Sequence, residues 1–399
     1  MDIYRTIMRI GVDACTWSNR RGFGRFTREL LEAVLADDKK NEYLFFVDSE
    51  SAESDEFPSN VKTVIAQTQV SPMEAASASG RRSAKDLWSM SREVLRYKID
   101  LFFFPAVYSY FPIFNRTKII VTVHDVIADH HPELVFPNSR LKMFWKLKQN
   151  IAIRQAHLIL TVSEYSKREI IEYFKLPESK VRVVSEAARS VFSVLQSGSE
   201  INETLSRFDL EPDKDFMLYV GGISPHKNLN ALIDAFQLIV SDANFSNVKL
   251  VLVGDYKDDP FFSAYPLLKK QVDRLGLSHK IIFTGYIEDL ELAHLYNSTS
   301  LVVLPSLEEG FGLPAVEAMA CGAPVAASNC GSLPEVLGKA GRFFDPTDTE
   351  NMAETLKHVL GDHTLKKEMS QTGLVRAKEF LWNKAAKDML VIFDELRSN

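Results

Sequence analysis

Two glutamates on either side of a glycine turn form the strongest chemical pattern in this sequence. Glu309 and Glu317 flank a Gly-Phe-Gly turn at 310–312, which follows an apolar run at 301–304. The run predicts a strand buried on both faces of a parallel sheet, and Pro314 predicts the start of the next helix. Glycines allow a ligand to approach the backbone, and the free N–H groups of a helix start favour an electron-rich group. The pattern therefore predicts a ligand-binding turn with one carboxylate on the loop and one on the helix.

Two further candidates follow other predicted strands. Lys227 lies in a Gly-Gly-x-x-Pro-x-Lys-Asn turn after the strand at 216–220, where its ammonium group could neutralise a diphosphate. His124 directly follows the strand at 119–123, at the carboxyl end where open α/β sheets bind ligands. An isolated lysine is usually surface charge and a His-Asp pair is usually a local turn, so both candidates depend on these positions.

The predicted strands and helices that carry these residues alternate regularly along the chain. Strands alternate with amphipathic helices, which predicts an α/β fold with parallel sheets. The alternation restarts after a stretch at 193–203 that lacks periodicity, and we expect the linker there. The sequence thus predicts domains at residues 1–195 and 196–380, and a final helix at 381–399 whose apolar stripe must pack on another element.

Composition limits the class of protein. The chain has 399 residues, 46% of them apolar, which suffices for two cores. Three scattered cysteines favour a reducing compartment, and their spacing predicts neither disulfides nor a metal site. Apolar runs are too short for a signal peptide or a membrane span, so we expect a cytoplasmic protein. The N-terminal half carries more basic than acidic residues, which favours an anionic acceptor or a membrane surface as its partner; no feature points to nucleic acid.

Glu-x7-Glu with Gly-Phe-Gly-Leu-Pro inside it resembles the signature of the retaining glycosyltransferases of family 4. The resemblance implies the GT-B fold, in which two Rossmann-like doubly wound domains face each other across a cleft and the C-terminal helix returns to the N-terminal domain. It implies that Glu309 and His124 contact the donor hexose as catalytic residues, and that Glu317 holds the ribose. The donor-binding residues that it implies are Gly22, Gly24, Gly222, His226, Lys227, Glu309, Gly310, Phe311, Gly312, Leu313 and Glu317.

The first glycine-rich turn, at residues 20–25, supports this interpretation and weakens another. Similar turns line the donor phosphate in the family, and doubly wound folds admit phosphate after their first strand. A Rossmann oxidoreductase is disfavoured because the position three after Gly24 is Thr27, so Gly-x-Gly-x-x-Gly is absent. Many members of the family carry an arginine where this chain has Gly222 or His226. The second phosphate-binding cation is then His226, or comes from Arg21 or Arg25 across the cleft.

We expect a metal-independent glycosyltransferase that needs no cofactor and takes its hexose from a nucleoside-diphosphate sugar. The Ser-Pro-x-Lys-Asn turn looks most like mannosyl and related hexosyl transferases, which favours GDP-mannose and polysaccharide biosynthesis. The acceptor is a glycan, a lipid-linked glycan or a small molecule, and the loop at 71–82, with Arg81 and Arg82, is placed to meet it. A GT-B epimerase or hydrolase and a non-catalytic sugar-nucleotide sensor are the alternatives.

A basic helix at 136–154 has two interpretations. Its apolar residues could pack in the core with the basic face in water, or the helix could lie on anionic lipid as a peripheral membrane contact. The regular βα alternation around the helix favours the core interpretation.

Overall fold

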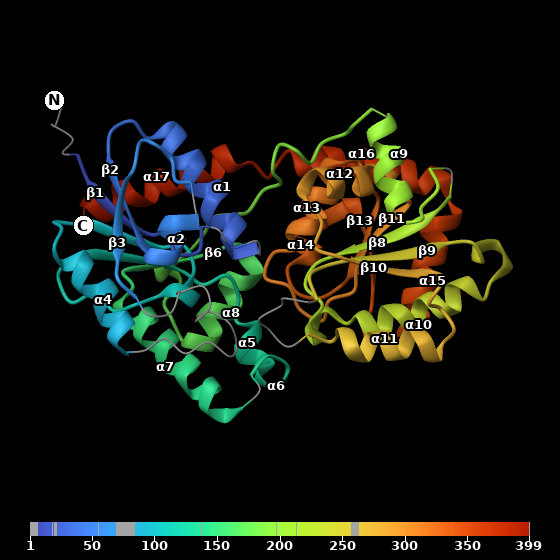
Figure 1. The fold of residues 1–399 in the computed structure, drawn as a ribbon, viewed down its shortest axis with the longest axis horizontal. Helices are drawn as coiled ribbons and strands as arrows, with labels where there is room; N and C mark the ends of the chain where they lie inside the picture. The colour runs from blue at the N-terminus through green and yellow to red at the C-terminus, as the bar shows by residue number, and fades with distance from the viewer. Residues whose placement is uncertain are drawn as a thin grey trace. The chain divides into compact units, whose positions relative to one another are not determined.

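The computed structural model describes residues 7–17, 19, 22–54, 56–68, 84–136, 138–196, 198–212, 214–256 and 263–398. The predictions made for Arg21, Arg81 and Arg82 lie outside these residues. The chain divides into two compact units (Figure 1). The N-terminal unit comprises Met1–Glu186 with Trp382–Asn399, and the C-terminal unit comprises Ala187–Leu381.

A seven-stranded parallel sheet forms the centre of the N-terminal unit, in the order β3-β2-β1-β4-β5-β6-β7. The order reverses between β1 and β4, which are neighbours although β2 and β3 lie between them in sequence. The strands are β1 Arg9–Asp13, β2 Glu42–Asp48, β3 Lys62–Ala66, β4 Leu101–Phe104, β5 Lys118–Thr122, β6 Leu158–Thr161 and β7 Val181–Val183. β4 is Leu-Phe-Phe-Phe and every residue of it is buried, as expected for a central strand covered on both faces.

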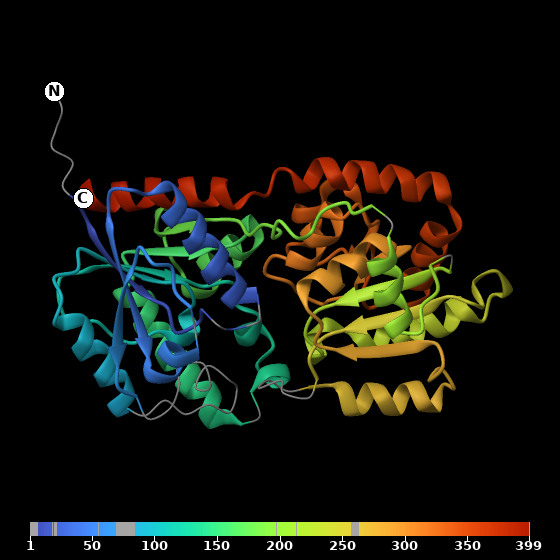
Figure 2. The same cartoon turned by 45° about the horizontal axis from the view of Figure 1, so that its top comes forward.

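Helices cover this sheet, and the last helix of the chain is one of them. The described α-helices are α1 Gly22–Asp37, α2 Ser49–Ser54, α4 Ala84–Leu95, α5 Ile127–His130, α6 Pro132–Val135, α7 Ser139–Gln155, α8 Glu164–Phe174 and α17 Trp382–Ser398. Short 3₁₀ turns occupy Val107–Ser109 and Glu178–Lys180. α17 packs along α1 (Figures 1 and 2), and the rings of Phe26 and Trp382 meet at 6.2 Å. The predicted return of the C-terminal helix is confirmed.

The prediction of a glycine turn at residues 20–25 is partly wrong. α1 begins at Gly22, so Gly22 and Gly24 belong to its first turn. A Cβ on Gly24 would lie 2.0 Å from the carbonyl oxygen of Asn19, so the helix start passes too close to the preceding loop for a side chain. Gly24 therefore serves close packing at the helix start, whereas an added Cβ on Gly22 would meet no atom within 4 Å. The donor contact expected of both glycines stays a prediction.

The C-terminal unit repeats this plan with a parallel sheet in the order β10-β9-β8-β11-β12-β13. The strands are β8 Phe216–Val220, β9 Lys249–Val253, β10 Ile281–Gly285, β11 Leu301–Leu304, β12 Val325–Ser328 and β13 Gly341–Phe344. The order reverses between β8 and β11, and ligands of open α/β sheets bind beyond the carboxyl ends of strands at such a reversal. The loops that follow β8 and β11 carry Lys227 and Glu309.

The described α-helices of this unit are α9 Ser199–Arg207, α10 Leu229–Val240, α11 Tyr265–Arg274, α12 Asp289–Ser298, α13 Leu313–Ala320, α14 Leu333–Leu337, α15 Thr349–Gly361 and α16 His363–Ala377. The 3₁₀ turns are Pro225–Lys227, Ala243–Phe245 and Gly338–Ala340.

The stretch at 193–203, expected to be a linker, contains the first half of α9. This helix packs on α12: Leu205 is buried, and the Thr204 hydroxyl lies 2.8 Å from Nδ1 of His294. Its apolar stripe is too short for periodicity to reveal.

Candidate active site

The loop between β11 and α13 has the predicted form. β11 is fully buried and ends at Leu304, and α13 begins at Leu313 with Pro314 in its first turn. Gly312 precedes the helix in the left-handed region, with φ of +91°. Any side chain at that position would be strained. Glycine is thus required for the chain to turn from the strand into the helix.

Glu309 is paired with Lys227 at the reversal point of the sheet. The Nζ atom of Lys227 lies 2.7 Å from Oε1 of Glu309, and the Ser306 hydroxyl donates to the same oxygen at 2.7 Å. The two charged side chains are only 17% and 14% exposed. Burial alone would raise the pKa of Glu309, but the charge and hydrogen bond of Lys227, helped by Ser306 and His226, outweigh burial and lower it. Glu309 is therefore ionised at neutral pH.

The backbones of the two loops are also bound to each other. Asn228, left-handed with φ of +57°, donates from its side-chain amide to the carbonyls of Pro305 at 3.2 Å and Pro346 at 2.8 Å. The backbone N–H of Leu307 donates to the carbonyl of His226 at 2.9 Å. These bonds fix the loop after β8 against the loop after β11, so the ion pair rests on a rigid frame.

A third segment supports Glu309 from behind. The hydroxyl and the backbone N–H of Ser332 both donate to the carbonyl of Glu309, at 3.0 and 3.1 Å. Gly331 is left-handed with φ of +65°, and a Cβ there would lie 2.6 Å from the backbone nitrogen of Glu309. The segment at 331–332 thus holds the position of Glu309 through backbone contact.

Replacement of Gly331 by alanine is expected to destabilise the protein and displace Glu309. A left-handed alanine costs about 1–2 kcal/mol, and the overlap with the backbone of Glu309 adds to that cost. Gly276→Ala is the matched control, because Gly276 has a φ of +70° and no atom within 4 Å of the added Cβ. Denaturant unfolding should show a larger loss of unfolding free energy for Gly331→Ala than for Gly276→Ala. Equal losses would mean that Gly331 does not support the loop.

Glu317 occupies a more enclosed position on α13. It is 1% exposed, and the hydroxyl of the buried Tyr296 on α12 donates to its Oε2 at 3.2 Å. A buried carboxylate needs such polar partners because water does not solvate it. The interpretation of Glu317 as a solvated helix residue is wrong, and the predicted ribose contact stays a prediction.

The glycine turn after β8 lies next to the ion pair. Gly222 accepts a hydrogen bond from the buried hydroxyl of Tyr219 at 2.7 Å. Burial and the negative charge of Glu309 both raise the pKa of Tyr219, so its phenol stays protonated. His226 is half-buried beside Lys227, and its role as the second phosphate-binding cation stays a prediction.

His124 follows β5 in the N-terminal unit. Its Nε2 lies 3.1 Å from the carbonyl oxygen of Pro105, which can only accept, so Nε2 carries the hydrogen. Nδ1 lies 3.7 Å from Oε1 of Glu186, and the ring meets Phe26 edge-on at 4.9 Å. The ring is therefore held in one orientation, which suits a residue that positions a ligand. The side chain of Asp125 accepts from the backbone N–H of Ile127 at 3.0 Å, as the local-turn interpretation of that residue requires.

Comparison with known proteins assigns both units to glycosyltransferases. Residues 20–187 match the model described as Glycosyltransferase Family 4, and residues 201–375 match the model described as Glycosyl transferases group 1. O-antigen chain mannosyltransferase B of Escherichia coli is 34% identical over 66% of this chain and 67% of its own length. The chain belongs to the group 1 glycosyltransferases.

Two other proteins are similar to this glycosyltransferase. Serotype-specific mannosyltransferase WbdA of Escherichia coli is 31% identical over 67% of this chain, a match that spans 32% of WbdA. Anabaena HepE, solved in complex with UDP and glucose, superposes with a TM-score of 0.71 at 18% identity, over 98% of this chain and 100% of HepE. That likeness confirms the GT-B class of two Rossmann-like parallel-sheet domains.

Sequence reasoning missed several residues that organise the site of this glycosyltransferase. They are Glu186, Tyr296, Ser306 and Ser332. Ser306 and Glu186 each come a few residues after a strand, which was an available signal. The sequence around Tyr296 and Ser332 gave no such signal, because their partners, Glu317 and Glu309, lie 21 and 23 residues away in sequence.

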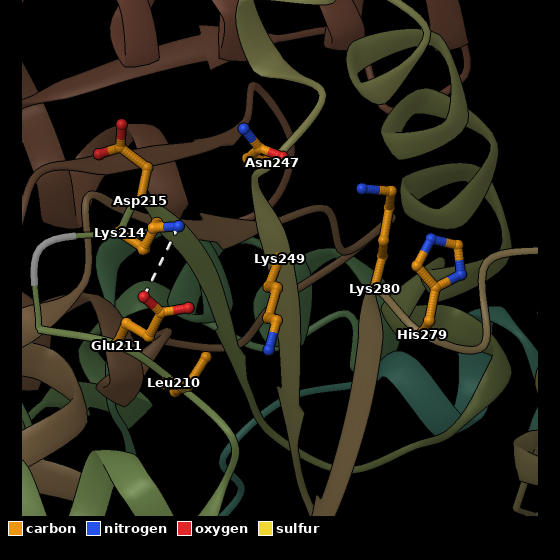
Figure 3. A pocket seen from close by; sticks show the side chains of 8 residues that line it. All are labelled: Leu210, Glu211, Lys214, Asp215, Asn247, Lys249, His279 and Lys280. Carbon is orange, nitrogen blue, oxygen red and sulfur yellow. Dashed lines mark ion pairs between the residues drawn. The ribbon is translucent and has the colours of Figure 1, made fainter.

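A pocket of about 190 Å³ in the C-terminal unit lies away from these residues. Figure 3 shows its lining, in which Lys249 begins β9 and Lys280 directly precedes β10, so it lies at the amino edge of the sheet. Lys214 is paired there with Glu211 at 3.6 Å. Because ligands of these sheets bind at the carboxyl edge, this pocket is not the candidate active site of the glycosyltransferase.

Every helix in the described part of the chain is too short or too polar to span a lipid bilayer.

Proposed function

We propose that the protein transfers mannose, with retention of configuration, from a nucleoside-diphosphate donor to a glycan, lipid-linked or small-molecule acceptor. The observation that carries this proposal is the Lys227–Glu309 pair at the point where the order of the C-terminal sheet reverses. Lys227 and Glu309 are hydrogen-bonded to each other, and together they match the two parts of a sugar diphosphate. The ammonium group suits the anionic diphosphate, and the carboxylate suits the hydroxyl groups of the sugar.

Lys227 supplies the electrostatic part of the chemistry. Departure of a nucleoside diphosphate builds negative charge on the phosphate that leaves the sugar, and fixed donors aimed at developing charge are usually the largest source of rate. The ammonium group of Lys227 and the N–H groups at the start of α13 are such donors. They make the reaction independent of a metal ion.

The carboxylates and His124 hold the rest of the donor. Glu309 accepts hydrogen bonds from the hexose hydroxyls, His124 orients the hexose, and Glu317 accepts from the ribose. We do not assign the role of nucleophile to Glu309, His124 or Glu317. The leaving phosphate takes the proton of the acceptor hydroxyl on the same face of the sugar, which retains the anomeric configuration.

Mannose is supported by the names of two relatives, O-antigen chain mannosyltransferase B and mannosyltransferase WbdA. The first of these names also supports a growing polysaccharide as acceptor. HepE was solved with UDP and glucose, so UDP-glucose is the donor to compare with GDP-mannose.

A panel of sugar nucleotides tests the proposal. The protein is incubated with GDP-mannose, UDP-glucose and related donors, with and without mannosyl oligosaccharides, and with EDTA in a parallel series. We expect slow release of GDP from GDP-mannose, faster release with acceptor, an α-linked product by NMR and no effect of EDTA. Conversion of the donor that acceptor does not accelerate would favour the epimerase or hydrolase, and binding without turnover would favour the sensor.

A further inference from the structure

The segment that leads the chain from the N-terminal unit into the C-terminal unit is hydrogen-bonded to helix α12. Residues 187–196 lie between β7 and α9, outside any helix or strand, and we call them the connecting segment. The side-chain amide of Asn297, near the end of α12, accepts from the backbone N–H of Leu195 at 2.8 Å and donates to the carbonyl of Ser193 at 3.0 Å. One side chain of α12 thus holds the backbone of the segment through two hydrogen bonds.

The connecting segment is attached to α12 at two more places. Nη1 of Arg189 lies 2.6 Å from Oδ2 of Asp289, the first residue of the helix. The ring of Phe192, which is 3% exposed, meets the fully buried ring of Tyr296 at 5.8 Å, nearly edge-on. The arginine is partly exposed, and such ion pairs stabilise little, so the buried aromatic contact is the stronger of these two attachments.

Tyr296 carries this attachment into the candidate active site. Its hydroxyl donates to Oε2 of Glu317 on α13 at 3.2 Å, and both side chains are buried. The segment also lies against the turn that ends α13, where a Cβ on Gly322 would be 3.7 Å from Cγ2 of Val194. The connecting segment therefore contacts the helix that supports Glu317 and the end of the helix that carries it.

We propose that Tyr296 is a positioning residue for Glu317 and that the connecting segment holds Tyr296 in place. A glutamate side chain has several rotamers, and a donor fixed by packing selects one of them before the ligand arrives. An ionised carboxylate has about four acceptor sites, so one carboxylate can accept from Tyr296 and from a ribose hydroxyl at the same time. Residues that do not touch the nucleotide thus determine how tightly it binds.

This inference rests on the proposed function, in which Glu317 accepts from the ribose. It adds that nucleotide affinity depends on Tyr296 and on the backbone that links the two units. The two proposals can be told apart by comparing two variants. If Glu317→Gln binds the nucleoside diphosphate like the wild type, both proposals are wrong. If Glu317→Gln loses affinity and Tyr296→Phe keeps it, only the present inference is wrong.

Calorimetric titration of the full chain with GDP, and with UDP in a second series, tests the inference. Tyr296→Phe removes the hydroxyl and keeps the ring that packs on Phe192. Affinity for the preferred nucleoside diphosphate should fall about tenfold, the effect of losing one hydrogen bond to a charged group. KM for the sugar nucleotide should rise by about the same factor while kcat stays within about twofold, because the ribose contact is the same in the ground state and the transition state.

Two further variants test the path through which Tyr296 acts. Asn297→Ala releases the backbone of the connecting segment without removing Tyr296 or Glu317, and it should lower the affinity about threefold to tenfold. The double variant Tyr296→Phe with Glu317→Gln should bind the nucleotide about as tightly as Glu317→Gln alone, because Tyr296 acts through Glu317.

Thr204→Val is the matched control for a purely structural effect. The Thr204 hydroxyl lies 2.8 Å from Nδ1 of His294, so this change also removes one buried hydrogen bond from α12. Thermal unfolding should show similar losses of stability in Thr204→Val and Tyr296→Phe, whereas only Tyr296→Phe should lose nucleotide affinity. The inference is overturned if Tyr296→Phe or Asn297→Ala binds the nucleotide like the wild type, or if Thr204→Val loses as much affinity as Tyr296→Phe. It is also overturned if the losses of Tyr296→Phe and Glu317→Gln multiply in the double variant.

Discussion

Replacement of Lys227 by methionine is expected to lower kcat/KM for the sugar nucleotide about 10²–10³-fold, the usual cost of removing one fixed donor from developing charge. Methionine keeps most of the volume of the lysine stem and removes the ammonium group. Affinity for the nucleoside diphosphate should fall as well, because both the ground state and the transition state carry charge on the phosphates.

The change also acts on Glu309, which contributes the other half of the ion pair. The charge and hydrogen bond of Lys227 are the strongest of the influences that lower the pKa of Glu309, so their loss should raise that pKa. Lys227→Arg keeps the charge but not the compact ammonium geometry and should recover only part of the activity. Lys270→Met, at an exposed lysine of α11, is the control for loss of one positive charge. Wild-type nucleotide affinity in Lys227→Met, measured by calorimetry, would remove Lys227 from the donor site.

The two glutamates should separate turnover from binding. Glu309→Gln is expected to cut turnover about 10²–10³-fold, with nucleoside-diphosphate affinity changed far less, because the proposed contact is to the hexose. Glu317→Gln should weaken nucleoside-diphosphate binding about tenfold to a hundredfold, since a charged acceptor for the ribose is replaced by a neutral one.

Calorimetry with GDP and a donor-hydrolysis assay measure the two effects on the same protein preparations. Glu317 is buried against Tyr296, so thermal unfolding must accompany the assay to separate loss of binding from loss of folded protein. Glu350→Gln, at an exposed glutamate of α15, controls for the lost charge. If Glu309→Gln and Glu317→Gln both keep wild-type rate and affinity, the assignment of the two carboxylates is wrong.

Much of the C-terminal unit could be predicted from local sequence. The apolar run at 301–304 coincides with β11, and the helix begins beside Pro314 as predicted. Both signals are local: a buried strand needs apolar residues on both faces, and proline suits the first turn of a helix. The family and the GT-B class followed from this segment and are confirmed.

The contacts that give the site its shape could not be predicted in this way. Lys227 and Glu309 are 82 positions apart, and their distance depends on β8 and β11 being neighbours in the sheet. The core position expected for the apolar residues of the helix at 136–154 is wrong for Phe144 and Leu147 of α7, which are 62% and 57% exposed, and the reason is different. Periodicity shows that Phe144 and Leu147 share a face, but it does not show whether that face points to the core or to solvent.

The discontinuity of the N-terminal unit affects the order in which the protein can be assembled. α17 packs on α1, yet the whole of 187–381 is translated between them. The C-terminal unit is continuous and can fold as soon as it leaves the ribosome, because domains generally fold as units during synthesis. The face of α1 that meets Trp382 stays uncovered until α17 has been translated. The first unit to be synthesised is thus the last to be completed, and until then α1 is open to chaperones and to premature contacts with other nascent chains.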